Sequence, residues 1–198
     1  MAISEVSICN MALGWVGARS IASLTENSPE ARACSQFYGL AREQTLRDHA
    51  WNFAQTRAAL ASIDVPAEYP EYHYAYSWPT DCLRALKVRN AAGSDEDFEV
   101  ALSIDGGGRM ILTNAEQAVL VYTKNVSDPS TFDPLYVRAL ARRVAADIGK
   151  VFFKNNQSAM QELETYYLNE IRKAQTQDAG EGKPETVEES TWITARFG

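Results

Sequence analysis

The hydrophobic pattern of this 198-residue chain changes period twice, from helical to strand-like and back. Apolar residues recur at helical spacing in roughly the first fifty residues and again after residue 133. Between about residue 70 and residue 125 they alternate with polar residues, which is typical of strands. Amphipathic helices have to bury their apolar stripes against something. We therefore predict an α+β fold, in which N- and C-terminal helix pairs form a four-helix bundle around a β-rich antiparallel insertion.

Helix-start signals locate the four predicted helices. They are Ser4, the pair Ser28-Pro29, the pair Asp133-Pro134, and a capping box of Ser158 and Gln161. Gly17 suits the end of the first helix. The predicted organisation is an N-terminal helical pair (1–55), a β-rich insertion (56–127), a C-terminal helical pair completing the bundle (128–176), and an extended C-terminal arm (177–198).

Aromatic residues crowd the first predicted strand. Tyr72, Tyr74, Tyr76 and Trp78 alternate with smaller residues, so a strand would carry all four rings on one face. A small sheet cannot bury every one of these rings. We predict that those left outside the core contact another protein subunit.

The end of the sequence combines an acidic run with interface-type residues. Residues 175–190 are mostly polar and carry a net negative charge, and their composition predicts a solvated, unstructured linker. Trp192, Ile193, Arg196 and Phe197 follow it, and such residues often anchor protein interfaces. We predict a flexible arm whose tip docks on a neighbouring protein. The alternative is that the tip folds back onto its own domain.

The composition narrows the class of protein. A net charge of −7 and a pI near 4.9 argue against a protein that grips nucleic acid along its surface, although an acidic wall would let DNA pass. Three scattered cysteines do not make a disulfide framework. There is no signal-peptide pattern and no apolar stretch long enough to span a bilayer. We expect a soluble protein made in a reducing cytoplasm.

No residue pattern points to catalysis. The two histidines, His49 and His73, have no partner at a spacing typical of a nucleophilic or metal site, and residues 105–108 read as a hairpin turn. A glycosidase-like carboxylate pair would have to come from Glu43 and Asp48, or from Glu162 and Glu164, which we interpret as solvated. Intrahelical or intersubunit ion pairs, with Asp147 and nearby Glu residues as partners, account for Arg138, Arg142 and Arg143. We therefore predict a non-enzymatic protein without cofactor or metal.

Several segments, taken in order, resemble one protein family. They are "ICNMALGWVGARS" and the residues that follow it to Ala54, "YSWPTDCLRALKV", "FDPLYVRALARRVAADIG" and the closing "STWITARFG". Together they cover nearly the whole chain. They resemble the head-to-tail adaptors of short-tailed phages, the tail tubular protein A or gatekeeper proteins.

The resemblance implies a structural virion protein at the head–tail junction, synthesised in the host cytoplasm. Family members form a ring, typically of twelve copies, beneath the portal protein and above the tail nozzle protein. Double-stranded DNA passes through the channel without specific binding, and no membrane is involved. In that setting Trp192, Ile193, Arg196 and Phe197 would be the portal-docking tip. The aromatic strand would face a neighbouring subunit or the tail.

Two other functions stay open at this stage. A virion-associated hydrolase would use the carboxylates named above. A cytoplasmic scaffold or binding module unrelated to phage would use the same aromatic and arm residues for other partners.

Overall fold

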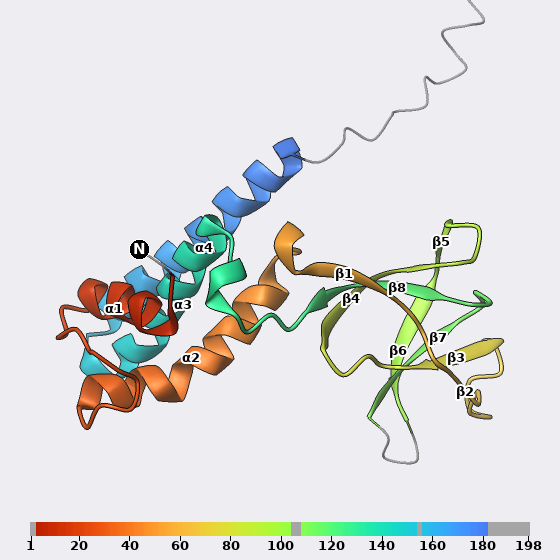
Figure 1. The fold of residues 1–198 in the computed structure, drawn as a ribbon, viewed down its shortest axis with the longest axis horizontal. Coiled ribbons are helices and arrows are strands. Elements are labelled where there is room, and N and C mark those ends of the chain that lie inside the picture. The colour runs from red at the N-terminus through yellow and green to blue at the C-terminus, as the bar shows by residue number, and fades with distance from the viewer. Residues whose placement is uncertain (1–2, 104–107, 154–155, 182–198) are drawn as a thin grey trace, which may run out of the picture.

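The computed structural model describes residues 3–103, 108–153 and 156–181 (Figure 1). Within these ranges the protein has four α-helices and two four-stranded antiparallel sheets, which confirms the predicted α+β class. The helices lie at one end of the molecule and the sheets at the other (Figure 1). The sheets are inserted in the sequence between the second and third helices.

The helices are α1 (Glu5–Trp15), α2 (Pro29–Asp48), α3 (Pro134–Phe152) and α4 (Gln157–Glu181). The first three begin at the predicted caps, since the side chains of Ser4, Ser28 and Asp133 each accept a hydrogen bond from a first-turn N–H. The prediction for α4 is wrong. Asn156 Oδ1 accepts from the Ala159 N–H at 3.1 Å, so the helix begins before Ser158.

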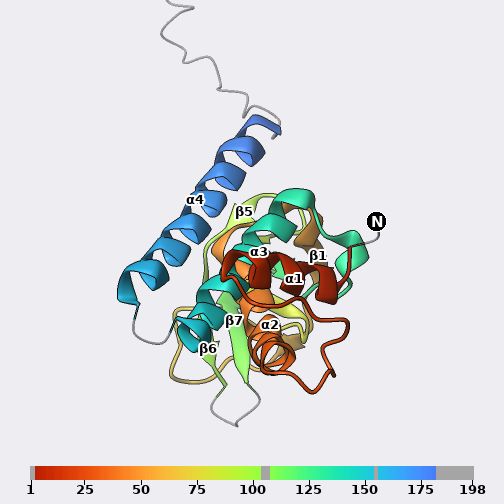
Figure 2. The ribbon, with the colours of Figure 1, turned by 90° about the vertical axis from the view of Figure 1, so that its left-hand side faces the viewer.

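The predicted arrangement of two helical pairs is also wrong. α3 is central, and α1, α2 and α4 all pack around it (Figures 1 and 2). Most residues of α3 from Tyr136 to Gly149 are buried, although Arg138 is 58% exposed. A helix with so wide a buried face needs neighbours on several sides. α1 and α2 pack mainly on α3 and little on each other, so the N-terminal helices do not form a pair of their own.

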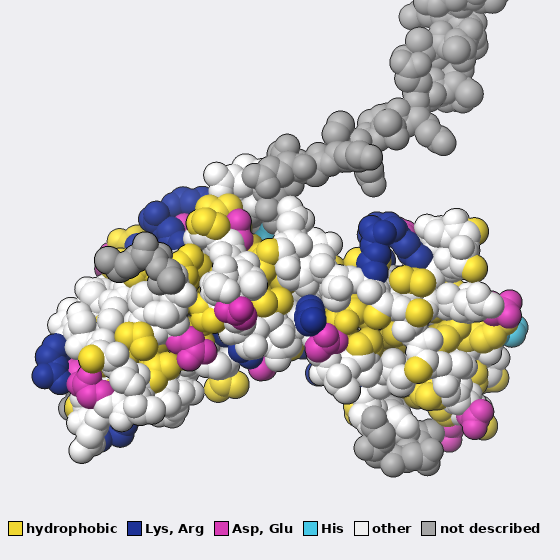
Figure 3. Space-filling view, in the orientation of Figure 1, with side chains coloured by type: hydrophobic (Ala, Val, Ile, Leu, Met, Phe, Trp, Pro, Cys, Tyr) yellow, Lys and Arg dark blue, Asp and Glu magenta, His cyan; other side chains and the backbone are white. Residues whose placement is uncertain are grey.

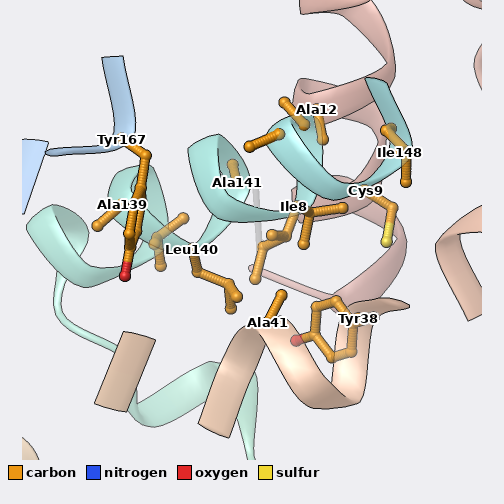
Figure 4. Close-up of a cluster of buried hydrophobic side chains, with 14 of the residues drawn as sticks. Ile8, Cys9, Ala12, Tyr38, Ala41, Ala139, Leu140, Ala141, Ile148 and Tyr167 are labelled. Atoms are coloured by element: carbon orange, nitrogen blue, oxygen red, sulfur yellow. The ribbon is translucent and has the colours of Figure 1, made fainter. Parts of the chain in front are cut away.

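One hydrophobic core joins the four helices. Figure 4 shows Ile8 and Ala12 of α1, Ala41 of α2 and Leu140 of α3 in the same cluster. Gly149 lets α4 approach α3 closely, because a Cβ atom built there would lie 2.6 Å from Cδ1 of Leu163. Where helices pack this closely, small residues such as Gly149 become part of the core.

The strands form two sheets of four. Sheet A has the order β1-β8-β4-β5 and sheet B the order β2-β3-β7-β6. Their bounds are β1 Gln55–Ala59, β2 Ser62–Ile63, β3 Tyr74–Ser77, β4 Cys82–Arg89, β5 Asp95–Glu96, β6 Phe98–Leu102, β7 Arg109–Thr113 and β8 Val119–Lys124.

Two bent segments connect the sheets at their edges. β1 leads into β2 across Leu60 and Ala61, and β5 leads into β6 across Asp97. The backbone keeps its pairing through the first bend, where the Leu60 N–H donates to Ala118 and the Ser77 N–H donates to Ala61, both at 2.9 Å. Strands that pass from one sheet to the next at a corner give a barrel-like sandwich. The β-rich insertion is therefore a closed, packed unit.

A polar junction connects the sheets to the helices. Arg47 at the end of α2 donates to the Leu83 carbonyl at 2.9 Å, and Arg84 donates to the Arg47 carbonyl at 3.0 Å. Asn125, just after β8, bonds both Arg42 and Glu43 of α2. Short 3₁₀-helices at Asn52–Ala54 and Pro129–Thr131 lie in the two connecting segments.

Candidate interaction surfaces

Three of the four predicted contact aromatics lie in the core between the sheets. Tyr76 is buried, and its hydroxyl donates to the Ala115 carbonyl at 2.8 Å. Tyr74 stacks on it, and Trp78 donates from Nε1 to the Cys82 carbonyl at 2.8 Å. Because these rings fill space between sheet A and sheet B, only their partly exposed edges are available to another protein.

Tyr72 lies on the opposite side of sheet B, contrary to the predicted single aromatic face. β3 begins only at Tyr74, and the Tyr72 N–H donates to the Tyr69 carbonyl in a turn before the strand. With Val65 and Tyr69, Tyr72 covers the outer face of the sheet. Its hydroxyl donates to Glu99 at 3.1 Å. The alternating pattern in the sequence therefore begins at Tyr72, two residues before the strand itself begins at Tyr74.

Four exposed carboxylates belong to the segments of this outer layer, since Glu68 and Glu71 adjoin Tyr69 and Tyr72 in sequence, Glu99 is on β6 and Asp97 precedes that strand. We call Glu68, Glu71, Asp97 and Glu99 the acidic face. Partial burial, the bond to Glu99 and the charges of Glu71 and Asp97 together raise the pKa of the Tyr72 hydroxyl. Within the residues that the structure describes, none of the four carboxylates forms an ion pair with Lys or Arg. Nothing in the described sheets therefore neutralises this face.

A groove lies where α1, α3 and α4 meet, and we call it the Arg142 groove. It has a volume of about 300 Å³ and is lined by Trp15, Arg142, Phe153, Ala159, Glu162, Leu163 and Tyr166. The Arg142 guanidinium carbon lies 3.7 Å from the Trp15 ring centroid and 4.8 Å from that of Tyr166. An arginine between two aromatic rings is held in one orientation with its donors at the edges. The sequence pattern did not predict this stack, because the three residues come from different helices.

Arg143, the next residue, has a structural role. It is buried, donates to both carboxylate oxygens of Asp147, and also reaches Glu164 at 3.0 Å. The intrahelical pair with Asp147 confirms the predicted ion pairing. Arg138 instead pairs with Glu170 of α4 at 3.0 Å.

The carboxylates considered for hydrolysis have structural hydrogen bonds. Asp48 accepts from the Tyr167 hydroxyl and Glu43 accepts from Asn125. Glu162 accepts from Tyr166, and Glu164 from Arg143. Each candidate carboxylate is thus bonded to a side chain of the helical core or the junction.

The two histidines lie in different parts of the fold. His49 caps the end of α2, and its ring packs edge-on against Trp51 with 4.9 Å between centroids. His73 is exposed and contacts Asn114 through its N–H and Nδ1. In the described ranges no group of three or more His, Cys, Asp or Glu side chains could hold a metal ion.

The residues predicted to dock on the portal, Trp192, Ile193, Arg196 and Phe197, lie outside the described residues. The start of the predicted arm is wrong, since residues 177–181 belong to α4. The residues at the end of α4, among them Gln, Thr and Ala, are compatible with a helix. Adding a residue to an existing helix is also easier than starting a new helix. No helix among the described residues is long and apolar enough to cross a membrane.

A scan of protein-family models and a search of curated proteins give no match to this chain.

Proposed function

We propose that this protein is the structural subunit of a head-to-tail connector in a short-tailed phage, forming a ring that joins the portal protein to the tail nozzle and extends the DNA channel. The observation that carries the proposal is the separation of contact surfaces along the molecule. The helical end, the sheet end and the end of α4 point in different directions (Figure 1). A subunit with separate surfaces suits a protein that contacts several neighbours at once.

The order of elements is compatible with the family resemblance. Helices at both ends of the sequence share one core, and the sheets form an insertion between them. In this proposal the helices build the ring, and the sheets face a neighbouring subunit or the tail. The net charge of −7 would keep the channel wall from binding DNA in transit. The protein would act in the virion after synthesis in the host cytoplasm.

The residues after α4 would form the portal-docking arm. Figure 1 shows the C-terminal end of α4 extending beyond the other helices. Trp192, Ile193, Arg196 and Phe197 would supply the anchors at its tip. A segment that becomes ordered only on docking would delay assembly until the portal is available.

Deletion of residues 182–198 tests the arm. We expect the truncated protein to keep its circular dichroism spectrum and melting temperature, because the described core lies before residue 182. It should lose cosedimentation with purified portal rings. A full-length variant with Trp192→Ala and Phe197→Ala is the matched control, and it should lose most binding without a change of chain length.

Two results would reject the docking arm. Undiminished portal binding by the truncated protein would place the anchor elsewhere, and unfolding of the truncated protein would make the tip part of the core. Cleavage of peptidoglycan that disappears in Glu43→Gln would favour the hydrolase instead.

A further inference from the structure

The Arg142 groove has the properties of one half of a protein interface. Arg142 is held between two rings, and its Nε atom is buried without a hydrogen-bond partner. No described residue forms an ion pair with its guanidinium. A planar guanidinium that is already oriented and lacks an acceptor is well placed to bind a carboxylate in two-point geometry. Stacked arginines beside Trp and Tyr are also frequent interface hot spots.

Positive charge continues along α4 from this groove. A second groove shares Tyr166 with it, and a third shares Glu170, Lys173 and Thr176 with the second. The three together are lined by four cations and two carboxylates: Arg138, Arg142, Arg172 and Lys173, against Glu162 and Glu170. Glu170 is already shared by Arg138 and Lys173. Figure 3 shows dark blue side chains gathered over α4. In a chain of net charge −7, this cationic surface is a local exception.

The acidic face lies at the other end of the molecule. Figure 3 shows magenta side chains at the far end of the sheets, away from the helices. Glu99 accepts from the Tyr72 hydroxyl at 3.1 Å, and beyond partial burial the negative charges of Glu71 and Asp97 act on the same hydroxyl and raise its pKa, so like charges repel one another here. Lys87 and Arg89 of sheet A are already paired with Asp95. A cationic partner from outside the chain would relieve this repulsion.

We propose that copies of this protein associate head to tail, with the acidic face of one copy seated in the Arg142 groove of the next. The inference rests on the proposed function and names the contact between neighbouring ring subunits. The two surfaces are complementary in charge and lie at opposite ends of one chain. A contact between different surfaces leaves one of each free, so it can repeat until a ring closes. Two copies of the cationic surface along α4 would repel each other, which disfavours pairing of groove with groove.

Site-specific crosslinking of the full chain tests this contact. The three native cysteines are buried, so an added surface cysteine would be the reactive one. Ala159→Cys places a thiol on the groove wall, and Ala67→Cys places one beside Glu68 of the acidic face. We expect an equal mixture of the two proteins to give a mixed disulfide dimer when diamide oxidises both thiols. The matched control replaces Ala67→Cys with Ala91→Cys, an exposed position in the turn between β4 and β5, and should give little dimer.

Charge reversals identify the groups responsible. Arg142→Glu in the Ala159→Cys protein should reduce the dimer about tenfold, the scale expected for losing a close charge pair at an interface. Glu71→Arg in the Ala67→Cys protein should do the same, and combining the two reversed proteins should restore the dimer. Arg57→Glu, on the exposed side of β1, changes net charge equally and should have no effect. Raising the salt concentration should weaken the crosslink.

Each outcome bears on the inference separately from the proposed function. Absence of the mixed dimer, or a dimer unaffected by both reversals, would overturn the head-to-tail contact. If Arg142→Glu fails to fold, Glu71→Arg on the exposed loop still decides, because that side chain has no contact in the core. Intact portal binding without this crosslink would reject only the inference. A normal crosslink without portal binding would reject only the connector function.

Discussion

Arg143 shows how a charged side chain can be part of a helical core. Its side chain is 9% exposed, and three of its nitrogen atoms donate to Asp147 and Glu164. The guanidinium also lies 5.4 Å from the Tyr167 ring, whose hydroxyl bonds Asp48 of α2. One arginine thus connects α3 with α4 and, through Tyr167, with α2.

Removing one partner of this network should destabilise the fold strongly, whereas replacing both partners of the buried pair should destabilise it less. Arg143→Leu leaves Asp147 buried without its main partner, and we expect the free energy of unfolding to fall by about 3–5 kcal/mol. The double variant Arg143→Leu/Asp147→Leu should be less destabilised, because no lone charge remains buried. Arg138→Leu is the control, because Arg138 is 58% exposed and Lys173 still pairs with Glu170, so its loss should cost less than about 1 kcal/mol. Urea unfolding measures all three, and an Arg143→Leu value near that of Arg138→Leu would contradict the network's role.

At the scale of elements, local signals in the sequence predicted helix starts well. Ser28-Pro29 and Asp133-Pro134 work through contacts within four residues, so no tertiary information is needed to recognise them. The position of Tyr72 could not be predicted in this way. Alternation continues through His73 in the sequence, but a turn bonded to Tyr69 directs the Tyr72 ring to the other side of sheet B. The Arg142 stack and the central position of α3 depend on contacts between distant segments, which periodicity does not encode.

Tyr122 of β8 gives sheet A a dependence on alkaline pH. Burial, and then the bond from its hydroxyl to Asp81 at 2.9 Å, raise the pKa of Tyr122 to about 12. Since an unfolded tyrosine titrates near 10, the folded state favours the neutral phenol. This contribution is complete below about pH 10 and is lost as the pH approaches 12.

Tyr122→Phe separates this effect from that of the other tyrosines. At pH 7 we expect the variant to be less stable by about 1 kcal/mol, because it lacks the hydrogen bond to Asp81. The difference between wild type and variant should shrink as the pH rises above about 10. Urea unfolding at neutral and alkaline pH measures it. A difference that stays constant across this range would show that the Tyr122 proton does not matter.

At the scale of the whole molecule, the helices and the sheets have separate cores connected by a largely polar junction. Arg47 and Asn125 supply most of its hydrogen bonds. Coupling between the two parts therefore depends on a few directional contacts together with Leu83, which packs against the helical core.

Removing those contacts should let the two parts unfold separately. We expect Arg47→Ala/Asn125→Ala to lower the protection of β8 amides from hydrogen exchange relative to those of α3, by about 1–2 kcal/mol. Arg32→Ala, which removes an exposed contact with Asn27 away from the junction, is the control. Equal losses of protection in α3 and β8 would mean that the parts remain one cooperative unit.

The central position of α3 also has a consequence for the chain during translation. α1 and α2 are synthesised first, but the helix that encloses their apolar faces ends at Phe152, more than one hundred residues after Asp48. At typical ribosome speeds that interval lasts on the order of ten seconds. During this time the sheets can already form, while the first two helices have no core to join. α3 thus completes the core around α1 and α2 only late in synthesis. Chaperones would therefore meet the exposed apolar faces of α1 and α2 before α3 has been made.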